Sequence, residues 1–369
     1  MKKRLLYQQV HEKLVTKIQS GSLPVGEKLP SEAELMNEFG VSSITLKKAL
    51  ELLKTEGYIS RRPRVGSYVI SDRPAAEHSE TRTFDRPLIG CVMTDFDDTF
   101  GTKLLSGMLD EEEGKAHLLL KKSHGDLHLE EKIVQEFIEM NVAGLIMLPA
   151  SSKFVSPALL ELATQKFPLI VLDRSLEGLP ISSISTDNIT AAKMITALLF
   201  QNGHQNIAMM TSKSEVSTLE NRIDGFIRAH ASFHNTYQED YIYRKIESVI
   251  PNSNVAVDTD IAHIVDFLQA RPEITAVVAA EYNIALMLRQ ACKALGKKIP
   301  EDLSIVCFDH PDQYFDHLAF RFTHIKQSQY KMGKKAITSL LEQIIHPEKV
   351  QKHVFDPVII EGDSVYKRN

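Results

Sequence analysis

The sequence lacks the features that place proteins in membranes, outside the cell or around metal ions. No apolar run approaches the roughly 18 residues that a membrane-spanning helix requires. The basic start of the chain, Met1 to Arg4, has no apolar segment behind it, so no secretion signal is expected. Cys91, Cys292 and Cys307 lie in or beside apolar stretches, without the spacing of metal ligands or disulfides. These absences predict a cytoplasmic protein with no metal site.

Motifs that carry enzyme chemistry are also missing. There is no phosphate-binding Gly-x-x-x-x-Gly-Lys loop, no Gly-x-Ser-x-Gly nucleophile turn and no His-Glu-x-x-His zinc helix. The segment from Gly101 to Gly107 lacks the glycine spacing of a dinucleotide-binding loop. His117, His124 and His128 are separated by polar loop residues, and we interpret them as solvated. The sequence therefore predicts a protein that is not an enzyme and holds no cofactor.

Charge is distributed unevenly along the 369 residues. The net charge is −5, but residues 1–72 hold 12 Lys and Arg against 8 Asp and Glu, whereas the remainder holds 31 against 40. A chain of this length is expected to form two or three domains. A basic N-terminal region on an acidic body indicates that a polyanionic partner would meet the N-terminal region.

Three helices and a hairpin are predicted within the first seventy residues. Val10, Leu14 and Ile18 recur every fourth residue, as on the buried face of a helix. Ser31, with Glu34 three residues on, has the pattern of a capping box, and the helix after it would bury Leu35, Met36 and Phe39. Ser42 can cap a third helix that buries Leu46, Ala49, Leu50 and Leu53 and ends at Gly57. Two strands, 58–62 and 67–70, follow around a tip at 63–66. This order is typical of a winged helix-turn-helix.

Such a fold places its second motif helix in the major groove of DNA, and the hairpin, or wing, reaches an adjacent groove or the backbone. Hydroxyl and lysine side chains gather at the start of the predicted third helix, and basic side chains lie on the wing. The candidate DNA-binding residues are Ser31, Ser42, Ser43, Thr45, Lys47, Lys48, Arg62, Arg64 and Gly66.

The remainder of the chain divides into a linker and an α/β body. Residues 71–86 have no apolar periodicity and are predicted to be a polar linker. From residue 87 to 369, short apolar runs alternate with helical stretches, as expected of buried parallel strands. The runs are 88–93, 117–120, 144–148, 169–172, 207–210, 276–279 and 305–308. The expected fold class is therefore α/β, with an N-terminal winged helix (1–70) and two doubly wound lobes.

The N-terminal segments closely resemble the GntR family of winged-helix regulators. The matching stretches are 6–10, 29–35, 39–42, 49–50, 56–59 and 66–69. Ser43 and Lys47 stand where arginines are usual in that family, and Arg64 replaces the first wing glycine. The resemblance implies DNA binding, but these departures leave the operator sequence open.

Residues 88–365 resemble the LacI-type effector domain, which shares the fold of periplasmic sugar-binding proteins. The matching stretches include 89–100, 142–146, 171–174, 187–188, 203–208, 222–226, 299–305, 308–309 and 325–333. The resemblance implies effector contacts at Asp98, Phe100, Asp173, Arg174, Arg222, Asp309 and Gln327. Glu281 stands where the family usually has asparagine, which leaves the identity of the ligand open.

The combination is similar to the arabinose-repressor type of GntR regulator. It implies a homodimeric repressor of carbohydrate-utilisation genes that binds double-stranded operator DNA and is released by a sugar, with a pentose as the first choice. Two alternatives stay open at this point: a non-sugar effector, and an effector that promotes DNA binding. GntR-type heads also occur on aminotransferase-like bodies, but no pyridoxal-binding site is recognisable here.

Overall fold

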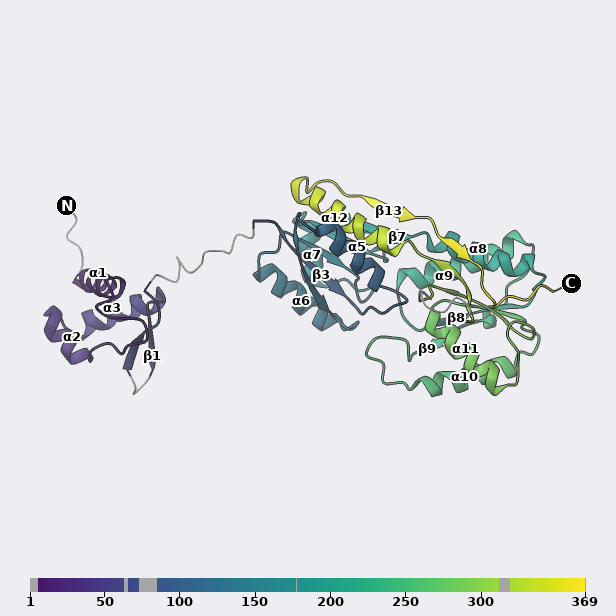
Figure 1. Cartoon of the computed structure of the whole chain (residues 1–369), viewed down its shortest axis with the longest axis horizontal. Helices are drawn as coiled ribbons and strands as arrows, with labels where there is room; N and C mark the ends of the chain where they lie inside the picture. The colour runs from purple at the N-terminus through teal and green to yellow at the C-terminus, as the bar shows by residue number, and fades with distance from the viewer. Residues whose placement is uncertain (1–5, 63–65, 73–84, 177, 312–318, 369) are drawn as a thin grey trace. The chain divides into compact units, whose positions relative to one another are not determined.

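The chain folds into two compact units, Met1–Asp85 and Arg86–Asn369. The computed structural model describes residues 6–62, 66–72, 85–176, 178–311 and 319–368. Arg64 and most of the predicted linker at 71–86 lie outside these ranges. Figure 1 shows the elements of each unit with their labels.

The first unit is a winged helix-turn-helix, as predicted. Its elements are α1 (Leu6–Gln19), α2 (Glu32–Phe39), α3 (Ser43–Thr55), β1 (Ile59–Arg62) and β2 (Gly66–Val69). The two strands pair antiparallel, with Ile59 opposite Val69. Ser31 and Glu34 form the predicted capping box at the start of α2. Gly66 belongs to β2 and not to the tip of the wing.

The core of this unit lies between α1, α3 and the hairpin. Val10, Leu14 and Ile18 of α1 are buried, as are all four positions predicted for α3. In α2 only Leu35 is fully buried, whereas Met36 and Phe39 are half-buried. An eight-residue helix on the outside of a small domain offers one fully enclosed position, which explains this difference from the prediction.

The second unit contains two lobes, each built on a six-stranded sheet. In the first lobe the strand order is β13-β7-β6-β5-β3-β4, and all neighbours are parallel. Its elements are β3 (Leu88–Met93), α5 (Thr102–Glu112), β4 (His117–Lys122), α6 (Leu127–Glu139), β5 (Gly144–Met147), α7 (Pro157–Thr164), β6 (Leu169–Leu172), β7 (Ser182–Thr186), α12 (Gln329–Ile345) and β13 (Lys352–Phe355).

The second lobe repeats this order as β14-β12-β11-β10-β8-β9, with β14 antiparallel to β12. Its elements are α8 (Asn188–Gln201), β8 (Ile207–Ser212), α9 (Ser217–Ser232), the 3-10 helix η1 (Glu239–Tyr241), β9 (Ile242–Ile246), α10 (Val257–Gln269), β10 (Ala276–Ala279), α11 (Tyr282–Ala294), β11 (Ser304–Phe308), β12 (Thr323–Lys326) and β14 (Val358–Ile360). Buried apolar side chains cover both faces of each sheet.

The chain passes between the lobes three times, after β7, after β12 and after β13. In Figure 1, α12 and β13 lie with α5 and β7 of the first lobe, although they are close to the C-terminus. The crossing segments are joined to each other: Thr186 Oγ1 donates to Gln327 Oε1 at 2.7 Å, and the Asp187 amide donates to Phe355 O at 3.0 Å. These bonds define a hinge region of three adjacent segments.

All seven predicted strands of the body are present, each within two residues of its expected ends. Within the described residues, five further strands of the body were not predicted. Of these, β7 (Ser182–Thr186) is rich in serine and alternates between buried and half-buried positions, and β9 (Ile242–Ile246) is an edge strand with exposed Arg244 and Lys245. Strands without a continuous apolar run resemble loops in the sequence, which is why they were missed.

Candidate functional site

A cavity of about 460 Å³ lies at the carboxyl ends of the strands in both sheets of the second unit. Parallel α/β sheets bind ligands at this edge, because the loops after the strands diverge there. Each lobe contributes side chains that lie within two residues after its strands, such as Asp95 and Asp173 from the first and Asp309 and Gln327 from the second. The cavity is therefore the natural candidate for an effector site.

Eight residues were predicted to bind the effector, and seven of them line this cavity. They are Phe100, Asp173, Arg174, Arg222, Glu281, Asp309 and Gln327. Asp98 is not among the lining residues and is exposed. The neighbouring Asp97 organises that loop, since its Oδ1 accepts the Thr99 and Phe100 amides at 2.7 and 3.0 Å, and Asp98 is left on the outside of the turn. Ligand contact by any of these residues stays a prediction.

Arg222 is the buried cation of the cavity, with only 4% of its surface exposed. Its Nε donates to Asn188 Oδ1 at 2.9 Å, its Nη1 donates to Ala280 O at 2.5 Å, and its guanidinium lies 3.9 Å from the centre of the Phe308 ring. Burial lowers the pKa of Arg222, and the carboxylates of Asp309, Asp173 and Glu281 oppose that shift. The guanidinium is thus held in one orientation and surrounded by negative charge.

Helix packing places Arg222 at this point. Gly225, one turn further along α9, faces α8 so closely that a Cβ there would lie 2.2 Å from Ile189 O. The glycine therefore lets α9 approach the start of α8, where Asn188 accepts the hydrogen bond from Arg222.

Asp309 is held by two amides at the hinge. Gln327 Nε2 donates to its Oδ2 at 2.8 Å, and Gln329 Nε2 donates to its Oδ1 at 3.1 Å. Gln329 also donates to Thr99 O at 2.8 Å and accepts the Gly101 amide at 3.0 Å, so it links the first lobe to Asp309. Burial raises the pKa of Asp309 to about 6, against the opposing charge of Arg222.

Two further carboxylates in the cavity are only partly satisfied. Ser212 Oγ donates to Glu281 Oε1 at 2.8 Å, and burial raises the pKa of Glu281. Thr218 Oγ1 lies 3.3 Å from Asp173 Oδ2, whereas the buried Asp173 Oδ1 has no hydrogen-bond partner. Arg174 donates to Pro149 O through Nη1, and its buried Nε also has no partner. Unsatisfied buried polar atoms are rare in folded proteins, and a ligand with hydroxyl groups would satisfy them.

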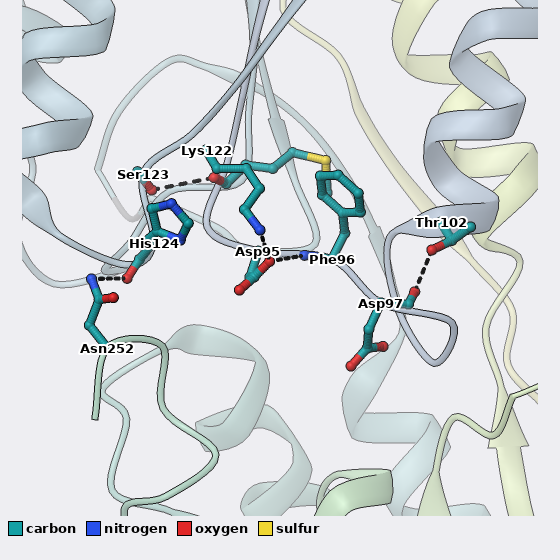
Figure 2. Close-up of polar contacts among 9 residues, drawn as sticks. Asp95, Phe96, Asp97, Thr102, Lys122, Ser123, His124 and Asn252 are labelled. Carbon is teal, nitrogen blue, oxygen red and sulfur yellow. Dashed lines mark hydrogen bonds and ion pairs between the residues drawn. The ribbon is translucent and has the colours of Figure 1, made fainter. Parts of the chain in front are cut away.

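Hydrogen bonds join the two lobes at two places near the cavity. Figure 2 shows Asn252 of the second lobe donating to the carbonyl of His124 of the first, at 2.9 Å. It also shows Lys122 bonded to Asp95. On the other side, the Ser217 amide donates to Ser152 Oγ at 2.9 Å. The lobes are therefore in direct contact beside the cavity.

Sequence reasoning missed Asn188, Ser212, Thr218 and Gln329 as members of this site. Asn188 and Gln329 each begin a helix directly after a lobe crossing, and both are nearly fully buried. An amide side chain at the first position of a helix was the available signal, but the crossings themselves were not predicted.

The start of α3 carries the candidate DNA-binding residues of the first unit. Ser42 caps the helix: its Oγ accepts the Thr45 amide at 3.4 Å and lies 3.0 Å from Thr45 Oγ1. Lys47 and Lys48 are exposed, and Lys48 Nζ lies 4.3 Å from the centre of the Tyr7 ring. Ile44 is 82% exposed, which is unusual for an aliphatic side chain and was not predicted. Ser43 is half-buried, and Ser31 is exposed in its capping box with Glu34.

Comparison with known proteins agrees with both units. Residues 6–69 match the family model of bacterial regulatory proteins, gntR family, and residues 196–365 match the periplasmic binding protein-like domain. The chain joins a GntR-type helix-turn-helix domain to a periplasmic-binding-protein-like domain. In the part of the chain that the structure describes, no helix is long and apolar enough to cross a membrane, and no group of three potential ligands could hold a metal ion.

One curated relative is similar along the whole chain, and others are similar over about three quarters of it. The arabinose metabolism transcriptional repressor of Geobacillus stearothermophilus is 26% identical over 99% of both chains. The ribose operon repressor of Bacillus subtilis is 27% identical over 76% of this chain and 81% of its own. A solved LacI family transcriptional regulator from Enterococcus faecium with bound ribose has a TM-score of 0.63 at 22% identity, over 76% of this chain and all of that one. The last of these shows a shared fold.

Proposed function

We propose that the protein is a sequence-specific DNA-binding repressor of carbohydrate-utilisation genes that a sugar releases from its operator. The observation that carries this proposal is the cavity between the lobes, where Arg222 lies among Asp173, Asp309 and Glu281. Guanidinium and carboxylate groups hold hydroxyls by charge-assisted hydrogen bonds. A GntR-type domain on the same chain supplies the DNA-binding function.

A pentose is the proposed first choice of effector. The two curated relatives described above are named for arabinose and ribose, and the cavity volume suits a small ligand. In the proposed complex, Arg222 and Asp309 contact hydroxyls from the second lobe, and Asp173 and Arg174 do so from the first. The half-buried ring of Phe100 lines the cavity and can stack on the apolar face of a sugar ring.

The proposed DNA contact is made by α3 and the wing of a homodimer. Lys47 and Lys48 neutralise phosphates, and the hydroxyls at the start of α3 face phosphates or base edges. A dimer would bind a palindromic operator whose half-sites lie about one helical turn apart or a multiple of it.

Coupling between the two functions is proposed to pass through the dimer of the second units. Sugar binding favours an arrangement in which the lobes are closed. Closure changes the distance between the two DNA-binding domains of the dimer and therefore changes their combined affinity for the operator. A ligand shifts such an equilibrium only through its different affinity for the two states. We expect a change in operator affinity of roughly 5–150-fold.

The test is operator binding by the whole chain and by residues 1–85, with and without the pentoses L-arabinose, D-ribose and D-xylose. The DNA is a duplex selected by the whole chain from a random library. The whole chain should bind it tightly and release it with one of the sugars, whereas the fragment should bind weakly and ignore them. The proposal is contradicted if no sugar changes the operator affinity of the whole chain, or if a sugar changes the operator affinity of the fragment. Tighter operator binding in sugar would instead identify an effector that promotes DNA binding.

A further inference from the structure

Glu281 occupies the N-cap position of α11 but does not cap that helix. A side chain at this position usually accepts a hydrogen bond from an amide in the first turn. Here no such bond is present, and the carboxylate instead accepts a hydrogen bond from Ser212 Oγ, at the end of β8, through Oε1. Glu281 Oε2 has no hydrogen bond or ion pair to any residue that the structure describes. It is also not one of the buried, solvent-inaccessible polar atoms without a partner. This oxygen is available to a ligand in the cavity that Glu281 lines.

The electrostatic surroundings of Glu281 are acidic. Among the lining residues within the described ranges, the cations are Arg174 and Arg222, and both already donate to backbone carbonyls, those of Pro149 and Ala280. The carboxylates that line the same cavity are Asp95, Asp97, Asp173, Glu281 and Asp309. Lys122 pairs with Asp95 from outside the lining, but the remaining carboxylates still outnumber the two guanidinium groups.

We propose that Glu281 restricts this cleft to uncharged polyols: its Oε2 accepts a hydrogen bond from a ligand hydroxyl, and its negative charge excludes sugar acids and sugar phosphates. Asp173, whose buried Oδ1 has no hydrogen-bond partner, adds a second carboxylate that repels an anion. A carboxylate or phosphate in the cavity would lie close to these groups, where the protein walls reduce screening by water and like-charge repulsion is stronger than in free solution. This inference rests on the proposed function, because it concerns the effector of the same cleft.

The test compares ligands that differ in charge at one position. L-Arabinose, D-fucose and D-galacturonate share one ring configuration and carry hydrogen, methyl and carboxylate, respectively, at the same carbon. D-Xylose, 6-deoxy-D-glucose and D-glucuronate form a second series, and D-ribose with ribose 5-phosphate forms a third. Binding to the whole chain is measured by calorimetry at pH 7.5. In whichever series binds, we expect the neutral members to bind at least about 30-fold tighter than the anion.

Three variants locate the cause of the discrimination. Glu281→Gln removes the charge and keeps the shape, so the ratio between neutral and anionic ligands should fall about tenfold or more. Glu281→Asp keeps the charge and should keep a preference for neutral ligands. Glu361→Gln, an exposed position in the same lobe, should leave the ratio unchanged. Thermal unfolding with and without ligand confirms that each variant is folded.

The outcomes separate this inference from the proposed function. An anion that binds wild type as tightly as its neutral partner, or a ratio that Glu281→Gln leaves unchanged, overturns the role of Glu281 while sugar sensing stands. If no member of any series binds, sugar sensing itself fails, and this inference fails with it.

Discussion

Asp173 and Asp309 occupy equivalent positions in the two lobes. Each follows the third strand of its sheet order, β6 or β11, and each adopts a left-handed backbone, with φ of 58° and 62°. The amide of Asp173 donates to Ile184 O at 2.8 Å, and that of Asp309 donates to Ile325 O at 2.9 Å, each on the next strand. Aspartate tolerates this conformation better than most residues. The shared turn places one carboxylate from each lobe in the same cavity.

Replacement of Arg222 tests the centre of that cavity. Arg222→Ala should abolish the response to effector, with affinity reduced at least about 100-fold, because it leaves the surrounding carboxylates without their cation. Calorimetry measures the loss. Arg228→Ala is the matched control, since Arg228 is on the same helix but is exposed and paired with Asp224. Near-normal effector affinity in Arg222→Ala would contradict the assignment.

The contact between lobes in Figure 2 contributes to closure. Asn252→Ala removes the hydrogen bond to His124 O, which is worth about 0.5–1.5 kcal/mol, so effector affinity should fall about two- to tenfold while operator affinity without effector is kept. Asn235→Ala is the control, because the Asn235 side chain donates to Gln205 within its own lobe. Equal effector affinity in the two variants would show that this contact does not stabilise closure.

Lys47 should contribute one phosphate contact on DNA. Lys47→Ala is expected to weaken operator binding and to reduce the slope of log affinity against log salt by about one. Lys54→Ala is the control on the same helix, because Lys54 bonds Glu51 in the last turns of α3. Affinity and slope are measured by titration at several salt concentrations. An unchanged slope for Lys47→Ala would remove this residue from the interface.

Ile44 should read a thymine methyl group in the major groove, where apolar side chains make that contact. Replacing thymine by deoxyuridine at the contacted position removes the methyl group and should weaken wild-type binding about three- to fivefold. Ile44→Ala should bind both duplexes equally. Scanning every thymine of the selected operator identifies the position. If no position shows a loss that depends on Ile44, the contact does not exist.

The raised pKa of Asp309 predicts a pH dependence of stability. The pKa of this carboxyl is about 6 in the folded protein and 3.8 ordinarily. Between these pH values the folded state binds more protons than the unfolded state, so burial of Asp309 destabilises the fold increasingly as pH rises. From pH 5 to pH 7.5 wild type should lose about 1–1.5 kcal/mol of unfolding free energy relative to Asp309→Asn, which does not titrate there. Urea unfolding at both pH values measures the difference. If the unfolding free energies of wild type and Asp309→Asn change equally between the two pH values, this prediction is wrong.

Hydrophobic periodicity and capping residues were sufficient to predict the helices with one buried apolar face and the strands with a continuous buried apolar run. The face of α1, the Ser31 capping box and strands such as β5 and β10 follow from local patterns that the packed structure satisfies. The candidate site was predicted less completely. Arg222 and Asp309 were predicted from the sequence, whereas Asn188 and Gln329, which hold them, were not. Asn188 meets Arg222 only because α8 packs against α9, and Gln329 meets Asp309 only because the chain crosses between the lobes after β12.

The bonds around Asp309 join the ligand site to the hinge. Gln327 and Gln329, the two amides that hold its carboxylate, flank Ser328 in the second crossing, and Gln327 also accepts the hydroxyl of Thr186 beside the first. The groups that would sense the effector are therefore the groups that set the angle between the lobes. A genetic screen should consequently recover two opposite classes of mutant from the segment around Gln327 and Gln329. One class no longer responds to the effector, and the other shows the effector response when no effector is present.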